Sequence, residues 1–145
     1  MAALAVTVAS VLKSASGNSA IGTAGATITQ GQPVYVDTTV TPNTIKPANG
    51  SSAGSAVIAT VAGIALNAAL TGQPISYVTT DTAFAHGFSI SDVAAGQIVY
   101  LDDTAGNMTV TFADLDATDW VTAIGIINAT ETTMNLLPLA PVVKA

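Results

Sequence analysis

The chain of 145 residues contains no cysteine and no arginine, and its only histidine is His86. The lack of cysteine excludes disulfides and thiolate metal sites, and a single imidazole excludes a multi-histidine metal site. The chain contains three lysines, Lys13, Lys46 and Lys144, and nine acidic residues, which gives a net charge of -6. Because nucleic-acid binding relies on basic residues that displace phosphate counterions, we expect binding neither to nucleic acid nor to an anionic membrane.

Charged residues of either sign are scarce, at 8% of the chain, against about 25% in typical soluble domains. This scarcity predicts a large protein–protein interface, and the alternative is a monomer coated in Thr, Ser, Asn and Gln. The apolar start, residues 1–12, lacks the leading basic residues of a secretory signal. Residues 53–70 are apolar but consist mostly of Ala, Gly, Ser and Thr, so we expect buried strand rather than a membrane helix.

Aromatic residues make up only 5% of the chain, whereas Val, Ile and Thr are frequent and twelve glycines and six prolines interrupt them. Beta-branched residues favour a pleated sheet, so the composition predicts an all-β domain. The phrase GQPVYVD at residues 31–37 returns as GQIVYLD at 96–102, with a partial copy, GQPISYV, at 72–78. Each copy is typical of a glycine turn that leads into a half-buried strand.

The alternation of apolar and polar residues predicts eight strands. Residues 3–12 are expected to form a strand or extended arm, residues 20–30 a weak strand, residues 81–87 a loop, and residues 141–144 a tail. The stretch 113–119 is expected to be an acidic turn with one turn of helix. The predicted strands are residues 33–38, 44–48, 56–66, 74–80, 97–102, 108–112, 120–128 and 132–139.

An internal duplication organises these strands. After the GQ phrase, GIALNA at residue 63 is matched by GIINAT at residue 125, and a turn and last strand follow each. Coincidence is the alternative, but the shared order favours two copies, at about 31–80 and 96–139. We therefore predict a compact β-barrel or sandwich built from two similar four-strand halves, with an N-terminal arm and loop (1–19) and a single β domain (20–145).

The order GQPVYVD, VAGIALNAALTGQPISYVTT, GQIVYLDDTAGNMT and DWVTAIGIINATETTMNLL resembles the small capsid decoration proteins of tailed bacteriophages, also called cement or head-stabilising proteins. The resemblance covers residues 31–137 and is weaker before them. It implies a structural, β-rich virion protein, often a homotrimer, made in the host cytoplasm. Such a protein binds the major capsid protein on the outer capsid surface where capsomers meet, and it stabilises the shell.

Two places in the chain are candidates for partner contact. In the arm, Leu4, Val6, Val8 and Leu12 share one face by alternation, and such a segment can add as a strand to the sheet edge of a partner. Trp120 is either a core residue, which we favour, or a contact anchor, since Trp is enriched at binding hot spots.

Catalytic chemistry finds little support, and we predict that the chain is not an enzyme and needs no cofactor. His86 has no nucleophile elbow near it and is expected to be a surface or loop-packing residue. The segment DLDATD lacks the glycine and terminal glutamate of a calcium loop, so turn caps are expected rather than a metal site. A carbohydrate- or surface-binding β module of a fibre or adhesin is the alternative function, and the few aromatics argue against it. The carboxylates weighed as cation ligands are Asp102, Asp103, Asp114, Asp116 and Asp119. Asp37 and Asp102, which match across the repeat, are expected to be strand-end caps rather than an acid/base pair.

Overall fold

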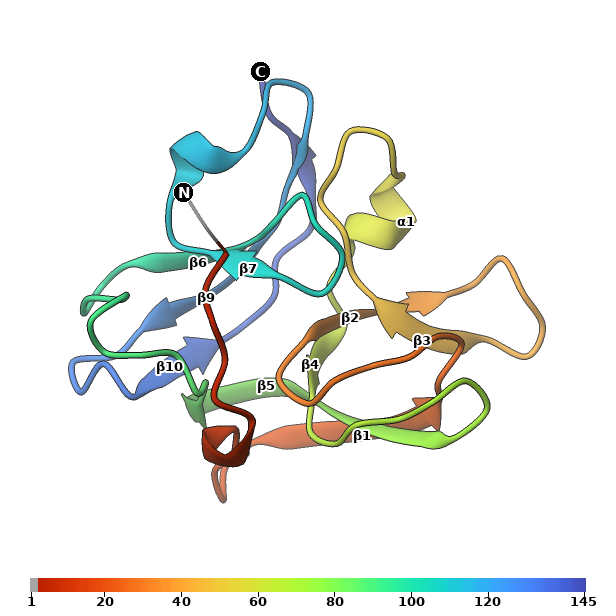
Figure 1. Ribbon diagram of the computed structural model, residues 1–145, viewed down its shortest axis with the longest axis horizontal. Coiled ribbons are helices and arrows are strands. Elements are labelled where there is room, and N and C mark those ends of the chain that lie inside the picture. The colour runs from red at the N-terminus through yellow and green to blue at the C-terminus, as the bar shows by residue number, and fades with distance from the viewer. Residues whose placement is uncertain (1–2) are drawn as a thin grey trace.

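A nine-stranded antiparallel sheet forms most of the fold in the computed structural model, which describes residues 3–145 (Figure 1). The all-β prediction is therefore confirmed. The sheet strands are β1 (Asn18–Thr23), β2 (Pro33–Asp37), β3 (Thr44–Pro47), β4 (Gly63–Ala65), β5 (Pro74–Ala85), β6 (Ile98–Leu101), β7 (Met108–Thr109), β9 (Ala123–Ile127) and β10 (Thr133–Leu136). The other elements are α1 (Ala56–Ala59), β8 (Trp120–Val121), β11 (Val142–Val143) and short 3-10 turns at Val8–Ser10 and Phe112–Asp114.

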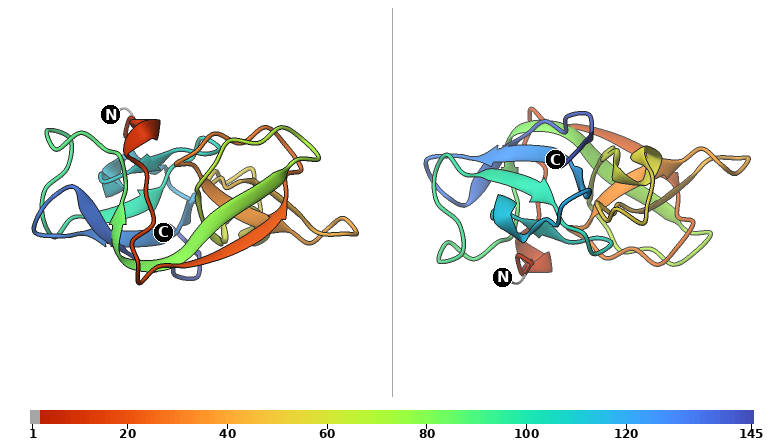
Figure 2. Two further views of the ribbon diagram at one scale, coloured as in Figure 1. Left: turned by 90° about the horizontal axis from the view of Figure 1, so that it is seen from below. Right: turned by 90° about the horizontal axis from the view of Figure 1, so that it is seen from above.

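The two predicted halves have the same strand order. The sheet runs β3-β2-β4-β5 in the first half and β7-β6-β9-β10 in the second, and β5 pairs with β10 where the halves meet. The hydrogen bonds correspond as well. The Gly31 N–H donates to the Ala65 carbonyl and the Gly96 N–H to the Ile127 carbonyl, both at 2.8 Å. The prediction of two similar four-strand halves is confirmed, and Figure 2 shows them side by side, joined through β5.

Every Gly-Gln pair makes the same turn. The three glycines have φ of 83° to 91°, a region that glycine enters without the steric penalty of a side chain. The glutamine then closes the turn, because its side-chain oxygen accepts the backbone N–H three residues earlier. The donor–acceptor pairs are Thr29 to Gln32, Leu70 to Gln73 and Ala94 to Gln97, at 2.9, 2.8 and 2.7 Å.

Two apolar clusters fill the fold. In the first half, β1 pairs with β5 (Figure 2), and the Gly25 N–H donates to the Ile45 carbonyl of β3 at 2.8 Å, so the strands curl around a small cluster that includes Ile28 and Ile75. The large cluster lies between the halves. It joins Ile64 and Val78 of the first half to residues of the second such as Met134.

The repeated glycines Gly63 and Gly125 mark close backbone contacts. A Cβ on Gly63 would lie 2.0 Å from the Val78 carbonyl oxygen, and a Cβ on Gly125 would lie 2.5 Å from the Asn135 carbonyl oxygen. Val78 pairs with Ile64, and Asn135 pairs with Ile126, so the contact is equivalent in the two halves. Glycine is required here because the neighbouring strand leaves no room for a side chain.

The predicted strand over residues 56–66 is wrong in its first half. Residues 56–59 form α1, and only β4 at Gly63–Ala65 is strand. Ala59 is buried and its carbonyl accepts the hydroxyl of Thr122 at 2.7 Å, which ties the helix to the second half. A short apolar run is consistent with helix or strand, and tertiary contact decides between them. Among residues 3–145, no helix is long and apolar enough to cross a membrane.

The expected loop at residues 81–87 is also mostly strand. The strand β5 continues to Ala85 because its second part pairs with β10, with Phe84 opposite Met134. The predicted strand 120–128 is divided at Thr122 into β8 and β9, and the expected tail contains β11, which pairs with β8. Strand 108–112 is reduced to β7, because a 3-10 turn begins at Phe112.

Candidate functional site

The N-terminal arm lies against its own domain. The Leu4 N–H donates to the Met108 carbonyl and the Thr7 N–H to the Gly87 carbonyl, each at 2.8 Å, and Leu12 exchanges two backbone hydrogen bonds with Ala85. Of the two predicted alternatives, strand or extended arm, the arm is the one observed, because a 3-10 turn at Val8–Ser10 interrupts the segment and only isolated bridges form. The extended arm is thus docked along the ends of β5 and β7.

The turn splits the four arm residues predicted to share one face. Leu4 and Val6 are half-buried and pack against the large core cluster. Val8 and Leu12 are 40% and 64% exposed. The neighbouring Val11, on the opposite face by alternation, is the buried residue of this stretch. In the docked arm, therefore, only Val8 and Leu12 of the four are available to a partner.

His86 is buried beneath the docked arm rather than exposed at the surface. Its ring stacks on Phe88 with centroids 4.4 Å apart, and its Nδ1 accepts the Phe88 N–H at 2.9 Å. The neutral ring therefore carries its proton on Nε2, which is buried and has no acceptor placed with good hydrogen-bond geometry. Burial lowers the pKa of His86, and the backbone carbonyl of Glu131 opposes this only in part. Of the two predicted alternatives, packing holds and surface exposure is wrong.

Acidification from pH 7.5 to 5.5 is expected to lower the free energy of unfolding through His86. The unfolded chain takes up a proton near pH 6.5, whereas burial keeps the folded imidazole neutral to lower pH, so protons favour unfolding in this window. NMR titration of the sole imidazole, together with denaturation at both pH values, measures the effect. His86→Gln should lose this pH dependence, and a folded pKa at or above 6.5 would contradict the expectation.

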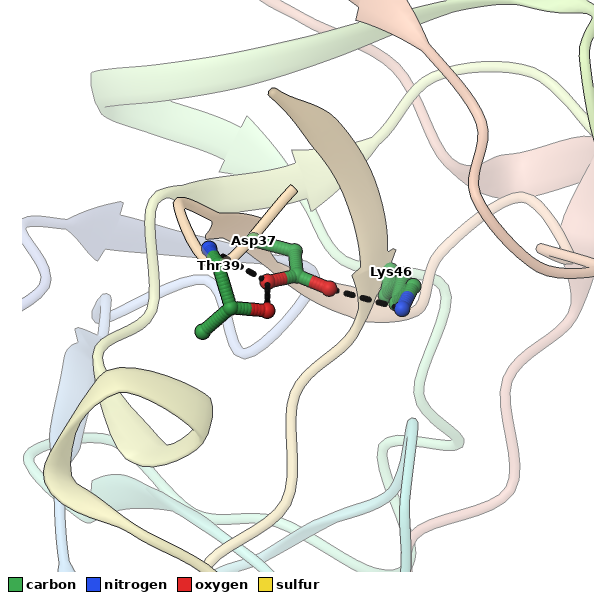
Figure 3. A network of polar contacts seen from close by, with 3 residues as sticks. All are labelled: Asp37, Thr39 and Lys46. Atoms are coloured by element: carbon green, nitrogen blue, oxygen red, sulfur yellow. Dashed lines mark hydrogen bonds and ion pairs between the residues drawn. The ribbon is translucent and has the colours of Figure 1, made fainter. Parts of the chain in front are cut away.

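Asp37 closes the β2–β3 hairpin through a polar network (Figure 3). One carboxylate oxygen accepts Lys46 Nζ at 2.7 Å, and the other accepts the Thr39 N–H at 2.9 Å and the Thr39 hydroxyl at 2.5 Å. The hydrogen bond from Lys46, followed by those from Thr39, lowers the pKa of Asp37 to about 2. The predicted role as a strand-end cap is confirmed.

Asp102 takes the matching place in the second half without a lysine beside it. Its carboxylate accepts the Asp103 N–H at 2.9 Å, which fits the predicted cap. Burial raises the pKa of Asp102, and the nearby charges of Asp103 and Asp114 raise it further. The same position in the repeat therefore favours the charged carboxylate in one half and disfavours it in the other.

Asn substitutions at these two positions are expected to act in opposite directions at pH 7. Asp37→Asn should lower the denaturation midpoint because it removes the charge paired with Lys46. Asp102→Asn should raise the midpoint because it removes a charge that burial penalises.

The dependence on pH should also differ. The stability that the Asp37 charge contributes is present above about pH 4 and is lost toward about pH 2. The penalty at Asp102 appears as pH rises through its raised pKa. Denaturation of Asp37→Asn and Asp102→Asn at pH 7 and at pH 3 tests these opposite effects. A lower midpoint than wild type for both variants at pH 7 would contradict the expectation.

Among the carboxylates weighed as cation ligands, Asp119 acts as a loop cap. Oxygens of Asp103, Asp116 and Asp119 lie within 4.8 Å of one another. The two oxygens of the buried Asp119 accept the N–H groups of Ser52 and Asp116, each at 2.8 Å. These bonds fix two loops against each other, and they are the turn chemistry expected of an Asp in a loop.

Trp120 is half-buried and packs against the large core cluster. Its backbone N–H donates to the Gly50 carbonyl at 2.7 Å, so the residue joins β8 to the loop before α1. This position agrees with the favoured core role. Its use as a contact anchor stays a prediction that concerns only the exposed part of the ring.

A second apolar surface, which the sequence pattern does not indicate, lies on the outer face of β6, β9 and β10. A groove of about 150 Å³ is lined by Ile98, Ile126, Leu137 and Leu139, with Gly125, Ala123 and Asn135. We call it the β9 groove. The four large side chains are 39% to 56% exposed. No signal in the run AIGII at 123–127 could have located it, because such a run is equally typical of a strand buried on both faces.

The candidate surfaces are therefore the docked arm, with Val8 and Leu12 outward, and the β9 groove. Both surfaces expose large apolar side chains, which is typical of places where another molecule binds. In the comparisons with known proteins, the chain matches no protein-family model and no curated protein.

Proposed function

We propose that this protein is a structural virion protein that decorates the capsid of a tailed bacteriophage. In this proposal it binds the major capsid protein as a homotrimer, on the outer surface at capsomer junctions, and stabilises the shell. The observation that carries the proposal is the resemblance over residues 31–137. Its repeated phrases GQPVYVD and GQIVYLD form equivalent turns and strands, β2 and β6, in the two halves.

The charge of the chain supports an outer location. A protein without arginine and with a net charge of -6 is repelled by packaged DNA and gains nothing from the interior of the shell. Several copies held together would contact neighbouring capsomers at once. Such linked contacts raise avidity by factors of roughly 10² to 10⁴ over one footprint when the geometry allows, which resists separation of the capsomers.

The arm is the proposed capsid contact. Val8 and Leu12 already face outward, and the backbone hydrogen bonds of Leu4, Thr7 and Leu12 are few and isolated. An arm held in this way can exchange its own partners for the edge of a sheet in the capsid protein, where the same backbone groups would be satisfied again.

Co-sedimentation with empty heads assembled from the major capsid protein of the same phage tests the proposal. Wild type should sediment with the heads, and the double variant Val8→Asp/Leu12→Asp should bind at least tenfold more weakly. Val40→Asp is the matched control, because Val40 is also 40% exposed but lies in the β2–β3 hairpin. If wild type stayed in the supernatant, the proposed function would be wrong. If the arm variant bound like wild type, the arm would not be the contact.

A further inference from the structure

The β9 groove is the exposed counterpart of a face that the first half buries. Ile64 in β4 and Ile126 in β9 both follow the tight glycine and pair with equivalent positions of the next strand. Ile64 is completely buried in the large cluster between the halves, whereas Ile126 is 48% exposed. The second half thus keeps an apolar residue at a position where its own chain supplies no covering layer, and a layer from elsewhere would complete the packing.

The groove has the size of one aliphatic side chain. Its volume is about 150 Å³, and a cavity of this order lined by Leu and Ile holds an apolar group about as large as benzene. Among residues 3–145, no charged side chain lines it, and Asn135 is its one polar lining residue. Its occupant should therefore be a protruding apolar side chain in an uncharged setting.

The chain presents such a side chain at Ile21. This residue lies in β1, which pairs with β5, and is 79% exposed, the highest value among the large hydrophobic residues in 3–145. Its neighbours on the same face are Ser19 and Thr23, both exposed and uncharged. An isoleucine that contributes so little to its own fold is suited to contact with another molecule.

The distribution of charge decides how two copies can meet. Residues 1–85 contain two acidic residues and two lysines and are neutral, so the whole net charge of -6 lies in residues 86–145, which form the groove. Two grooves placed face to face would bring both acidic halves together. A groove placed against β1 instead brings an acidic half toward a neutral half that contains two of the three lysines, which is the electrostatically favoured arrangement.

We propose that copies of this chain associate head to tail, with Ile21 of one copy seated in the β9 groove of the next. Such a contact is heterologous, because it joins two different patches, and it forms a closed ring when the rotation between copies permits. The inference rests on the proposed function for the idea that several copies act together. It concerns contact between copies, however, and not contact with the shell.

Disulfide trapping tests the pairing directly, because the native chain has no cysteine. Ile21→Cys and Leu137→Cys proteins are mixed under mild oxidation and separated without reductant. A linked dimer should form in the mixture and at least tenfold less in either protein alone. Leu137→Cys that links to itself as readily would indicate a two-fold contact and overturn the proposal. So would a mixture no better than the control pair of Leu137→Cys with Ile90→Cys, whose Ile90 is 60% exposed.

Sedimentation of Ile21→Asp and Ile126→Asp provides the second measurement. Each should shift the assembly toward monomer by at least tenfold in dissociation constant, while Ile90→Asp should keep the wild-type mass. A wild type that remains monomeric at the concentrations used for capsid binding would overturn the proposal. Failure of the proposed function is seen separately, as assemblies that form in solution but do not sediment with empty heads.

Discussion

Gly63→Ala is expected to lower the free energy of unfolding by about 3 kcal/mol, the upper part of the range for overpacking. The added Cβ would lie 2.0 Å from the Val78 carbonyl oxygen and 2.9 Å from its carbon. Both are backbone atoms of β5, the strand that pairs with both halves. The clash cannot be relieved by turning a side chain, so β4 and β5 must separate, and the contacts of Ile64 with the large core cluster weaken with them.

Gly96→Ala is the matched control for this steric effect. Gly96 has φ of 83° and nothing within 4 Å of an added Cβ, so its substitution costs only the left-handed backbone conformation, about 1 kcal/mol. Gly125→Ala, with its contact at 2.5 Å, should fall between the two. Urea denaturation of the three variants ranks them. Equal losses for Gly63→Ala and Gly96→Ala would show that the strands adjust freely and that close contact is not what the repeated glycine provides.

The local nature of the glycine turns explains which part of the fold could be predicted from the sequence. The strands β2 and β6 begin within one residue of the predicted positions because the Gly-Gln turn is local. Its φ and its side-chain hydrogen bond involve four consecutive residues. The duplication followed from the same local phrases. Pairing between the halves did not, because no local pattern states that β5 continues past Thr80 to reach β10.

Residues 56–66 show the opposite case. The apolar run predicted one long strand, but Ala59 is buried in the core as part of a helical turn. The Thr122 hydroxyl, which belongs to the second half of the molecule, donates to the Ala59 carbonyl. Thr122 is 63 residues from Ala59 in the sequence. The contact that favours helix over strand therefore lies outside the short windows from which secondary structure is predicted. The same reasoning applies to His86, whose burial depends on Phe88 and on the arm above it.

The candidate surfaces divide in the same way. The sequence predicted the apolar alternation of the arm, but a 3-10 turn at Val8–Ser10 changes the direction of its second part. Leu4 and Val6 therefore pack against the core, while Val8 and Leu12 are exposed. The β9 groove could not be predicted from the sequence, because the exposure of Ile126 depends on which strands the fold leaves uncovered. Comparison of the two halves supplies that information, since it shows which apolar positions have lost their covering layer.

Ile64→Ala and Ile126→Ala separate folding from association at one position of the repeat. Ile64 is completely buried, so its truncation leaves a cavity and should lower the free energy of unfolding by about 2–5 kcal/mol at every protein concentration. Ile126 is 48% exposed, and its truncation should change the stability of a dilute sample by no more than about 0.5 kcal/mol.

The difference should grow with concentration only for Ile126. If copies meet at the β9 groove, association stabilises wild type by mass action, so its melting temperature rises as the protein is concentrated. Ile126→Ala should show a smaller rise, while Ile64→Ala should melt lower throughout but keep the wild-type dependence on concentration. Calorimetry over a hundredfold range of concentration measures both. An Ile126→Ala curve parallel to wild type would mean that the exposed isoleucine has no role in contact between copies, because burial of its side chain is the source of the expected gain.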